Sequence, residues 1–369
     1  MSKKILQIIP TLVRGGAEKQ LTTLVTRLPT DQFETHVALL TSGGPYLASL
    51  EEAGIPVHSI GKRWKLDIPA YFRLKRLIQD LQPDLVHTWI FAANSYGRLA
   101  SLKCGIKKIV AGERCVDPWK RWHEFVIDRY LAKRTHGMVT NSSGIRDFYQ
   151  SNGIPAEQFT MIPNGIEIPN LNPVAEMRRA LLEALELPPE TKLVGSVGRL
   201  WKQKRMKDLV WAADLLKCIR DDVHFLVVGD GPERWRLERF RDQVEIGDRF
   251  HFLGERADAK ELIACLDVFW LASDYEGQSN ALMEAMAAGV PVVATDIPGN
   301  RDLVVQDETG FLVPLGDRAA FAQRTERILN DASLHMNLSK NAIARMREEF
   351  TVEKMVSKYV DYYNGLLVD

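Results

Sequence analysis

The feature that most constrains the fold of this chain is a regular alternation of short apolar runs with stretches of helical period. In the first half the runs are KILQII, THVALLT, DLVHTWI, KKIVAGE and GMVTNSS, each followed by a helical or loop stretch. Parallel strands need long crossover connections, which are usually helices. The alternation therefore predicts an α/β fold, in which a parallel sheet is covered by helices on both faces.

A second series of runs follows a segment that resembles a linker. Proline and asparagine cluster in MIPNGIEIPNLNP, residues 161–173, as is typical of a linker. The runs after it are KLVGSVGRL, VHFLVVGDGP, RFHFLGE, VFWLAS, GVPVVATD and TGFLVP. We therefore predict two Rossmann-like, doubly wound parallel-sheet domains, at 1–170 and 171–351. The closing stretch at about 352–369 is helical in period, and periodicity leaves open whether it stays on the second domain or packs back on the first.

Two such domains indicate where a ligand should bind. Open parallel sheets bind ligands in the crevice at the carboxyl ends of their strands. The expected ligand site is therefore a cleft between the two domains.

The composition narrows the class of protein. A length of 369 residues, with 46% hydrophobic and 26% charged residues, is typical of a globular chain with two cores. The first apolar stretch covers only Ile5 to Ile9, which is too short for a signal peptide, and no later stretch approaches the roughly 18 residues of a membrane span. We therefore expect a cytoplasmic protein. The four cysteines have neither CxxC nor nearby His spacing, so they indicate no zinc site and no disulfide framework: Cys104, Cys115, Cys218 and Cys265.

The charge is distributed unevenly, although the formal net charge is zero. Residues 1–170 carry 22 Lys and Arg against 15 Asp and Glu, whereas residues 171–369 carry 26 against 33. Within 107–134, basic residues interleave with Trp119, Trp122 and other aromatic residues. This pattern suits peripheral contact with an anionic membrane or with an anionic acceptor. The alternative is a solvated helix whose aromatic side chains lie in the core. No nucleic-acid partner is expected.

The stretch YEGQSNALMEAMAAGVPVVATD contains Glu276 and Glu284, eight positions apart around a helix start. Ser279 or Asn280 suits the N-cap, the next residues are good helix formers, and a Gly and a Pro end the pattern, so we predict a helix over about 280–288.

The start of this helix could bind an anion, because its backbone amides and its dipole attract phosphate. Glu284, about one turn in, could accept hydrogen bonds from a ribose diol. Glu276, which we expect on an exposed loop, could accept hydrogen bonds from sugar hydroxyls on the other side of the phosphate. The spacing therefore suits both ends of a nucleotide sugar. An isolated pair of glutamates is otherwise usually a solvated surface feature.

This stretch resembles the signature of the retaining family-4 glycosyltransferases, in which a Glu, seven residues and a second Glu precede a small-residue helix and a PVVA strand. Other motifs similar to that family occur in the matching order: RGGAE (14–18), MVTNSS (138–143), IPNGIE (162–167), SVGRLWKQK (196–204), VVGDGPER (227–234), FLGERAD (252–258) and ETGFLVP (308–314). The resemblance covers essentially the whole chain. It implies the GT-B architecture, in which two Rossmann-like domains face each other across a cleft.

The resemblance also implies roles for particular residues. Arg199 and Lys204 would hold the donor diphosphate, Glu276 would bind the transferred sugar, and Glu284 would bind the ribose. A departing diphosphate gains negative charge in the transition state, so fixed cations would stabilise that state most. We take Glu276, Arg199, Lys204 and His87 as the catalytic candidates. The full donor-binding set is Gly15, Gly16, Gly198, Arg199, Lys204, Gly229, Leu253, Glu255, Arg256, Glu276, Gly277, Ser279, Asn280, Ala281, Leu282 and Glu284.

The acceptor-side candidates are His87, Asn141 and Arg146. His87 stands in PDLVHTW, at the end of a predicted strand of the first domain, where a carbonyl could equally satisfy its ring. Gln278 and Asp302 depart from the family pattern, which has an aromatic or apolar residue and a Glu at these positions. The identity of a relative's donor sugar therefore cannot be assumed for this chain.

The sequence contains no DxD triplet, so we expect no metal ion and no cofactor beyond the donor substrate, a nucleotide sugar. The mechanism that the resemblance implies is a front-face departure, in which the leaving phosphate helps to deprotonate the acceptor.

Our leading hypothesis is a retaining glycosyltransferase that moves a sugar from a nucleoside diphosphate to a hydroxyl of a glycan or lipid-linked acceptor, in cell-surface polysaccharide or lipopolysaccharide assembly. The alternatives are a sugar-nucleotide epimerase of the same fold, which needs no acceptor, and a catalytically silent subunit of a glycan-assembly complex. An NAD dehydrogenase is disfavoured, because GSVGRLW lacks the third Gly of the dinucleotide fingerprint.

Overall fold

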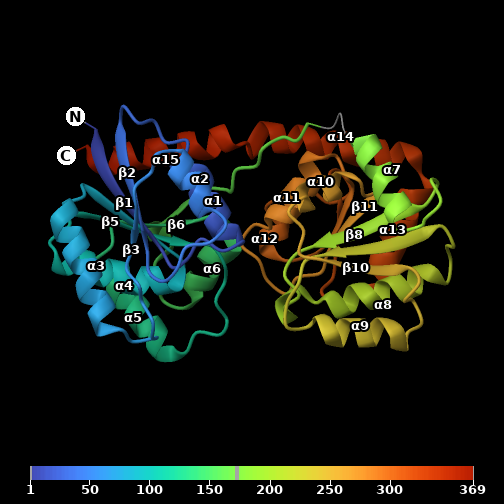
Figure 1. Cartoon of the computed structure of the whole chain (residues 1–369), viewed down its shortest axis with the longest axis horizontal. Coiled ribbons are helices and arrows are strands. Elements are labelled where there is room, and N and C mark those ends of the chain that lie inside the picture. Colours follow the sequence, from blue (N-terminus) through green and yellow to red (C-terminus); the bar gives the residue numbers. More distant parts are fainter. Residues whose placement is uncertain (1, 171–173, 369) are drawn as a thin grey trace. The chain divides into compact units, whose positions relative to one another are not determined.

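A computed structural model describes residues 2–170 and 174–368 of the chain. The chain divides into two compact units, each built around its own parallel sheet (Figure 1). One unit contains the residues up to Gly165 together with those from Val352 onward, and the other is Ile166–Thr351. The division falls inside the segment that the sequence identifies as a linker. Residues 171–173 of that segment lie outside the described residues.

The first unit contains, among its described residues, a seven-stranded sheet with the order β3-β2-β1-β4-β5-β6-β7. Its strands are β1 (Lys3–Ile9), β2 (Phe33–Leu39), β3 (Val57–Ser59), β4 (Leu85–Trp89), β5 (Lys108–Glu113), β6 (Gly137–Thr140) and β7 (Phe159–Met161). Its helices are α1 (Gly16–Val25), α2 (Leu47–Glu52), α3 (Ile68–Leu81), α4 (Ile90–Lys103), α5 (Trp122–Ala132), α6 (Ser143–Ser151), the 3₁₀ turn η1 (Ala156–Gln158) and α15 (Val352–Leu367).

The second unit contains, within its described part, a six-stranded sheet with the order β10-β9-β8-β11-β12-β13. Its strands are β8 (Lys192–Val197), β9 (Val223–Val228), β10 (Phe250–Gly254), β11 (Val268–Leu271), β12 (Val292–Thr295) and β13 (Phe311–Val313). Its helices are α7 (Val174–Ala184), the 3₁₀ turn η2 (Lys202–Lys204), α8 (Met206–Lys217), α9 (Arg234–Gln243), α10 (Ala259–Ala264), α11 (Asn280–Ala287), α12 (Pro298–Arg301), α13 (Arg318–Asn330) and α14 (Ala332–Glu349).

Alternate residues of the central strands pack on opposite faces of each sheet. In β1, Ile5 belongs to the same buried cluster as Leu21 of α1, whereas the next residue, Leu6, packs in a separate cluster with Leu74 of α3. Successive side chains of a strand point to opposite faces, so a continuous apolar run needs a helical layer on both sides.

The second sheet is covered in the same way. Val194 of β8 packs in one cluster with Leu209 of α8, while its neighbour Leu193 packs in another with Met286 of α11. The prediction of two doubly wound parallel sheets from the apolar runs is therefore confirmed.

The closing helix α15 packs on the first unit. Tyr359 and Tyr363 are fully buried in the cluster that contains Ile5 and Leu21. In Figure 1, α15 (red) runs beside α1 (blue), and the two helices are in direct contact. The last helix of the sequence thus completes the core that the first strand begins.

Sequence reasoning missed two strands, β3 and β7. Each has three residues and lies at an edge of the first sheet. Their side chains are half-buried or exposed, so neither shows the continuous apolar run that marks the central strands. Within the described residues, no helix has both the length and the apolarity needed to cross a membrane.

Candidate functional site

Four of the predicted donor-binding segments lie at one edge of the second sheet. They follow β10, β9, β8 and β11, which are neighbours in the sheet and are all parallel. The carboxyl ends of parallel strands meet at one edge, where open α/β sheets bind their ligands. We call this the donor edge; its loops are residues 198–205, 229–231, 254–258 and 273–279.

Glycines allow the first two of these loops to touch. Gly229 has φ +134°, and a Cβ atom on it would lie 2.1 Å from the carbonyl oxygen of Gly198. Any larger residue at 229 would therefore push the two loops apart, and its backbone would be strained. Both glycines belong to the predicted donor-binding set, and the structure brings them into direct contact.

Lys204 and Glu276 form the central ion pair of the donor edge. The ammonium of Lys204 donates to Oε1 of Glu276, and the Ser273 hydroxyl donates to the same oxygen at 2.7 Å. The side chains of Lys204 and Glu276 are only 15% and 11% exposed. The expectation that Glu276 lies on an exposed loop is therefore wrong, because it is held between a cation and a hydroxyl.

This arrangement leaves part of each group available for a ligand. An ammonium has three N–H donors, so Lys204 can bind Glu276 and also donate to a phosphate oxygen. Both contacts of Glu276 within the described residues fall on Oε1, so Oε2 can accept hydrogen bonds from sugar hydroxyls.

Further hydrogen bonds join the loop after β8 to the loop after β11. The Gln203 side chain donates to the carbonyl of Tyr275 at 2.6 Å, and the backbone N–H of Asp274 donates to the carbonyl of Gln203 at 2.8 Å. Lys204 and Glu276 therefore approach each other because their own backbones are joined.

Helix α11 begins and ends much as its sequence predicts. Ser279 is the N-cap, and its hydroxyl accepts from the backbone N–H of Leu282 at 3.4 Å. The helix covers Asn280–Ala287, one residue shorter than predicted, and Gly289 follows its end with φ +74°. Leu282 is fully buried, whereas Glu284 is half-buried on the first full turn. Ser279 and Leu282 can therefore act on a ligand only through the backbone and the cap.

The remaining donor-edge candidates range from buried to exposed. Arg199 is exposed, and its guanidinium lies 5.5 Å from the ring centre of Trp201. Arg256 is exposed and pairs with Asp258 at 2.6 Å, and Glu255 is also exposed. Gly277 and Ser279 are buried, while Leu253, Asn280 and Ala281 are half-buried.

Gly15 and Gly16 belong to the first unit, at the start of α1. A Cβ atom on Gly15 would lie 2.2 Å from Oε2 of Glu18, so the glycine lets this carboxylate fold back over the start of the helix. Their predicted contact with a donor diphosphate is not tested by this geometry and stays a prediction.

The burial of His87 argues against a direct role with the acceptor. Its ring is fully buried, and Nδ1 lies 2.7 Å from the hydroxyl of Tyr363. Burial, with a smaller effect of the nearby Arg114, holds the pKa of His87 well below its usual range. A neutral imidazole in the core of the first unit orients α15, and we do not include it among the residues proposed to act on substrate.

The other acceptor-side candidates lie in different environments. Asn141 is buried and donates to Oδ1 of Asn164 at 3.0 Å. Arg146 is half-buried and pairs with its neighbour Asp147 at 2.9 Å. Asn141 and Arg146 thus have separate partners among the described residues.

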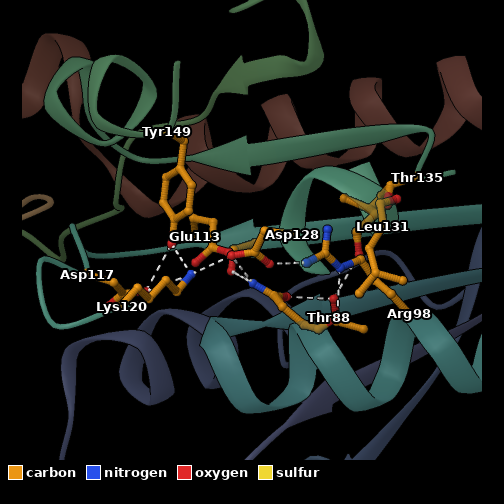
Figure 2. Close-up of polar contacts among 12 residues, drawn as sticks. Thr88, Arg98, Glu113, Asp117, Lys120, Asp128, Leu131, Thr135 and Tyr149 are labelled. Atoms are coloured by element: carbon orange, nitrogen blue, oxygen red, sulfur yellow. Dashed lines mark hydrogen bonds and ion pairs between the residues drawn. The ribbon is translucent and has the colours of Figure 1, made fainter. Parts of the chain in front are cut away.

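Sequence reasoning missed a group of buried charges in the first unit, which we call the buried charge cluster (Figure 2). Lys120 donates to Asp128 at 2.9 Å and lies 3.2 Å from Asp117, while Arg98 pairs with the other oxygen of Asp128 at 2.7 Å. Lys120 also donates to the hydroxyl of Tyr149 at 2.6 Å. Arg98 belongs to α4 and Tyr149 to α6, while the other three residues stand close together in the sequence. No single local motif therefore covers the whole cluster.

Glu113 is the third carboxylate of the buried charge cluster. It ends β5, is almost fully buried, and accepts a hydrogen bond from the Asn94 side chain at 2.8 Å. Burial, together with the like charges of Asp117 and Asp128, raises the pKa of Glu113 to about 7, although Lys120 opposes this. Near neutral pH this carboxyl group therefore carries a proton part of the time.

Within residues 2–170 and 174–368, no three His, Cys, Asp or Glu side chains are placed to hold a metal ion. Metal independence of the reaction remains a prediction.

Two family models match this chain, one in each half. "Glycosyltransferase Family 4" matches residues 14–168, and "Glycosyl transferases group 1" matches residues 177–345. The UDP-Gal:alpha-D-GlcNAc-diphosphoundecaprenol alpha-1,3-galactosyltransferase of Escherichia coli is 26% identical over 98% of this chain and 96% of its own length. The N-acetyl-alpha-D-glucosaminyl L-malate synthase of Bacillus anthracis is 34% identical, but the match spans only 48% of this chain and 46% of that protein.

Solved structures share the fold across nearly the whole chain. The crystal structure of Anabaena HepE in complex with UDP-glucose superposes with a TM-score of 0.87 at 23% sequence identity, covering 98% of this chain and 99% of that one. The architecture inferred from the motifs, two Rossmann-like domains of the GT-B type, is therefore confirmed.

Proposed function

This chain belongs to the family 4 glycosyltransferases, and from that premise we propose that it moves a sugar from a nucleoside diphosphate to a hydroxyl of a glycan or lipid-linked acceptor. The likeness to HepE, whose structure contains UDP-glucose, supports a UDP-linked sugar as the first donor to test. The name of the Escherichia coli relative, which acts on a diphosphoundecaprenol-linked sugar, supports assembly of a cell-surface polysaccharide or lipopolysaccharide.

The observation that carries this proposal is the Lys204–Glu276 pair at the donor edge. A cation that could bind the diphosphate and a carboxylate that could bind the sugar are joined there by a direct contact. The anomeric bond that breaks lies between the diphosphate and the sugar. The pair is therefore spaced to hold both sides of that bond.

In the proposed mechanism, Lys204 and Arg199 stabilise the diphosphate as it leaves the anomeric carbon. Negative charge on the departing oxygens is greater in the transition state than in the bound donor, so fixed cations lower the barrier. Glu276 orients the sugar through Oε2, and Ser273 fixes the carboxylate. The resemblance favours retention of anomeric configuration, with a phosphate oxygen accepting the proton of the acceptor hydroxyl on the same face.

Product analysis tests the activity. A thermal-shift screen of UDP, GDP, ADP and their sugars should identify the donor, because a ligand that binds the native state raises the melting temperature. With that donor and a polyprenyl-diphosphate-linked sugar as acceptor, we expect a new glycoside with the donor's anomeric configuration. Conversion of the nucleotide sugar without any acceptor would instead support the epimerase alternative. Binding without any turnover would favour the silent-subunit alternative.

We further propose that the first unit contacts an anionic membrane at the inner face of the cell membrane. Two segments, 62–76 and 118–134, form what we call the basic aromatic surface; Lys65 and Glu124 join them with an ion pair at 3.8 Å. Trp122 is 77% exposed and Leu66 is 86% exposed. The full set of exposed apolar side chains is Trp64, Leu66, Ile68, Phe72, Trp119, Trp122, Val126, Ile127 and Tyr130. Of the Trp, Phe and Tyr side chains in 119–130, only Phe125 lies in the core, which argues against the alternative of a solvated helix with its aromatic side chains buried.

The charge of this surface is positive because its acidic residues are used internally. Asp67 caps α3 by accepting from the N–H of Ala70, and Glu124 accepts from the N–H of Arg121 at the start of α5. Asp128 belongs to the buried charge cluster. The basic residues that remain exposed are Arg63, Lys65, Arg73, Arg76, Arg121, Lys133 and Arg134. Apolar side chains surrounded by cations favour a surface of anionic lipid.

Vesicle sedimentation tests the membrane contact. The protein should bind vesicles that contain phosphatidylglycerol and not vesicles of phosphatidylcholine alone. The change Arg121→Gln with Arg134→Gln should weaken that binding by about 2 kcal/mol, at about 1 kcal/mol for each cation near the surface. Trp122→Ala should also weaken it, whereas Trp235→Ala, at an exposed tryptophan of α9 in the second unit, is the matched control. Equal binding to both kinds of vesicle would remove the proposal.

A further inference from the structure

We propose that Arg205 is a positioning residue for the donor site: it fixes the loop that aims Lys204 at Glu276 and at the donor diphosphate. The inference rests on the proposed function, in which Lys204 binds that diphosphate. It adds a residue that neither the motifs nor the comparisons identify.

The backbone of Arg205 is in a conformation that needs support. The residue links η2 to α8 with φ +48° and ψ +35°, in the left-handed region that residues with a Cβ rarely adopt. A residue is held in that region only where its surroundings determine it, at a cost of order 1 to 3 kcal/mol. The contacts of the Arg205 side chain are the groups that hold it there.

The guanidinium of Arg205 binds two carboxylates. Nε donates to Asp208 at 2.5 Å, and Nη1 donates to Asp274 at 2.9 Å. Asp208 also accepts from Arg318 of α13 at 2.7 Å, so two cations and two carboxylates balance each other. Hydrogen bonds to these two aspartates raise the pKa of Arg205, against the opposing effect of burial. With Nε and Nη1 both bound to carboxylates, Arg205 is suited to hold the loop in place.

Arg205 and its neighbour Lys204 both contact the loop after β11. Lys204 pairs with Glu276, and Arg205 pairs with Asp274, two residues earlier on the same loop. Between them, the backbone N–H of Asp274 donates to the carbonyl of Gln203. Three consecutive residues of one loop are therefore fixed to three nearby residues of the other.

This arrangement explains how a flexible side chain can be aimed. A lysine has four rotatable side-chain bonds. Its contact with a diphosphate therefore contributes little binding free energy unless its backbone is already in place. Small displacements of a positioned group can cost large factors in rate, up to about 100-fold for 1 Å. The Arg205–Asp274 pair removes that freedom before the donor arrives, and Asp208 with Arg318 ties the same guanidinium to α8 and α13.

A double-mutant cycle tests the inference, with UDP as the probe and calorimetry as the measurement. In the wild-type background, Arg205→Gln should raise the Kd for UDP about tenfold, within the range of coupling measured for contacting residues. In the Lys204→Ala background the same change should raise it by less than about twofold, because the group that Arg205 positions is gone. Arg220→Gln is the matched control. It breaks an arginine–aspartate ion pair with Asp222, just before the amino end of β9 in the same sheet, and should leave the Kd unchanged in both backgrounds.

Each result distinguishes this inference from the proposed function. If Arg205→Gln weakens UDP binding equally in both backgrounds, or does not weaken it, the positioning role is overturned while the role of Lys204 stands. If Lys204→Ala itself leaves UDP binding unchanged, or wild type binds none of UDP, GDP and ADP, the proposed function is overturned and this inference with it. Arg205→Gly is a second variant should Arg205→Gln fail to fold. Glycine adopts the left-handed backbone without strain, so that variant removes only the side chain and should show the same non-additivity.

Discussion

Replacing Glu113 by glutamine should remove a pH-dependent loss of stability from the first unit. Glu113 lies beside the buried Asp128, the half-buried Asp117 and two buried cations. Its pKa is raised from 4.5 to about 7 by burial first and by these two aspartates next. The folded chain therefore holds this proton more tightly than the unfolded chain does. Stability should fall as the pH rises from 4.5 towards 7, and the loss should be complete above the folded pKa.

The magnitude follows from the width of that interval. One pH unit corresponds to about 1.4 kcal/mol, so the interval from 4.5 to about 7 amounts to on the order of 3 kcal/mol. Glutamine cannot ionise, and its carbonyl oxygen can still accept the hydrogen bond that Asn94 gives to Glu113. Relative to wild type, Glu113→Gln should therefore be nearly neutral at pH 4.5 and more stable by on the order of 3 kcal/mol at pH 8.

The assay must report on the first unit within the full chain. Hydrogen exchange of peptides from β5 and α5, measured in increasing urea at pH 5, 6, 7 and 8, gives the free energy of opening of this unit. Glu52→Gln, at an exposed glutamate of the same unit, is the matched control. If Glu113→Gln keeps the slope of wild type, or is less stable than wild type at pH 8, the assignment of this proton to Glu113 is wrong.

Three further predictions concern the second unit. Lys204→Ala should weaken UDP binding by about 1.5 to 3 kcal/mol, because one charge-assisted hydrogen bond is lost. If calorimetry gives the variant the same affinity for UDP as wild type, Lys204 does not bind the diphosphate. Glu276→Gln keeps the volume and the contact with Ser273 but loses the charge; turnover should fall about 10- to 100-fold while UDP still binds, and steady-state kinetics with unchanged turnover would refute the sugar-binding role. Burial, then the neighbouring His224, lowers the pKa of His251 from 6.5 to about 4, so its contribution to stability is fully present above pH 6.5 and is lost as the pH falls through about 4. His251→Gln should reduce this loss of stability at low pH, measured as the free energy of urea unfolding of β9 and β10. If the loss is unchanged in the variant, it is due to other groups.

Much of the fold could be predicted because the central strands are buried on both faces. Residues such as Leu193 and Val194 are both apolar since each faces its own helical layer, and this produces the continuous runs visible in the sequence. The edge strands β3 and β7 lack that double burial and so lack the signal.

The sequence names candidate members of the site but not their contacts. Lys204 and Glu276 stand in motifs, yet their pairing depends on two loops that meet only after the sheet forms. His87 shows the opposite case, because a polar residue at a strand end has the same sequence pattern whether it faces substrate or, as here, the hydroxyl of Tyr363. No motif marks Arg205 or Glu113, since each role also depends on a residue from another segment, Asp274 for Arg205 and Asp128 for Glu113.

The place of α15 has a consequence for how the chain is made. The side chain of Gln7 donates to the hydroxyl of Tyr363, a residue 356 positions later, and that tyrosine fills the core against β1. During synthesis the N-terminal sheet emerges first, but it cannot close its interior until the last helix leaves the ribosome. The face of the nascent sheet that α15 covers therefore stays exposed while the whole second unit is translated. A nonsense codon near the 3′ end of the gene should thus be most harmful to the part of the protein encoded at its 5′ end.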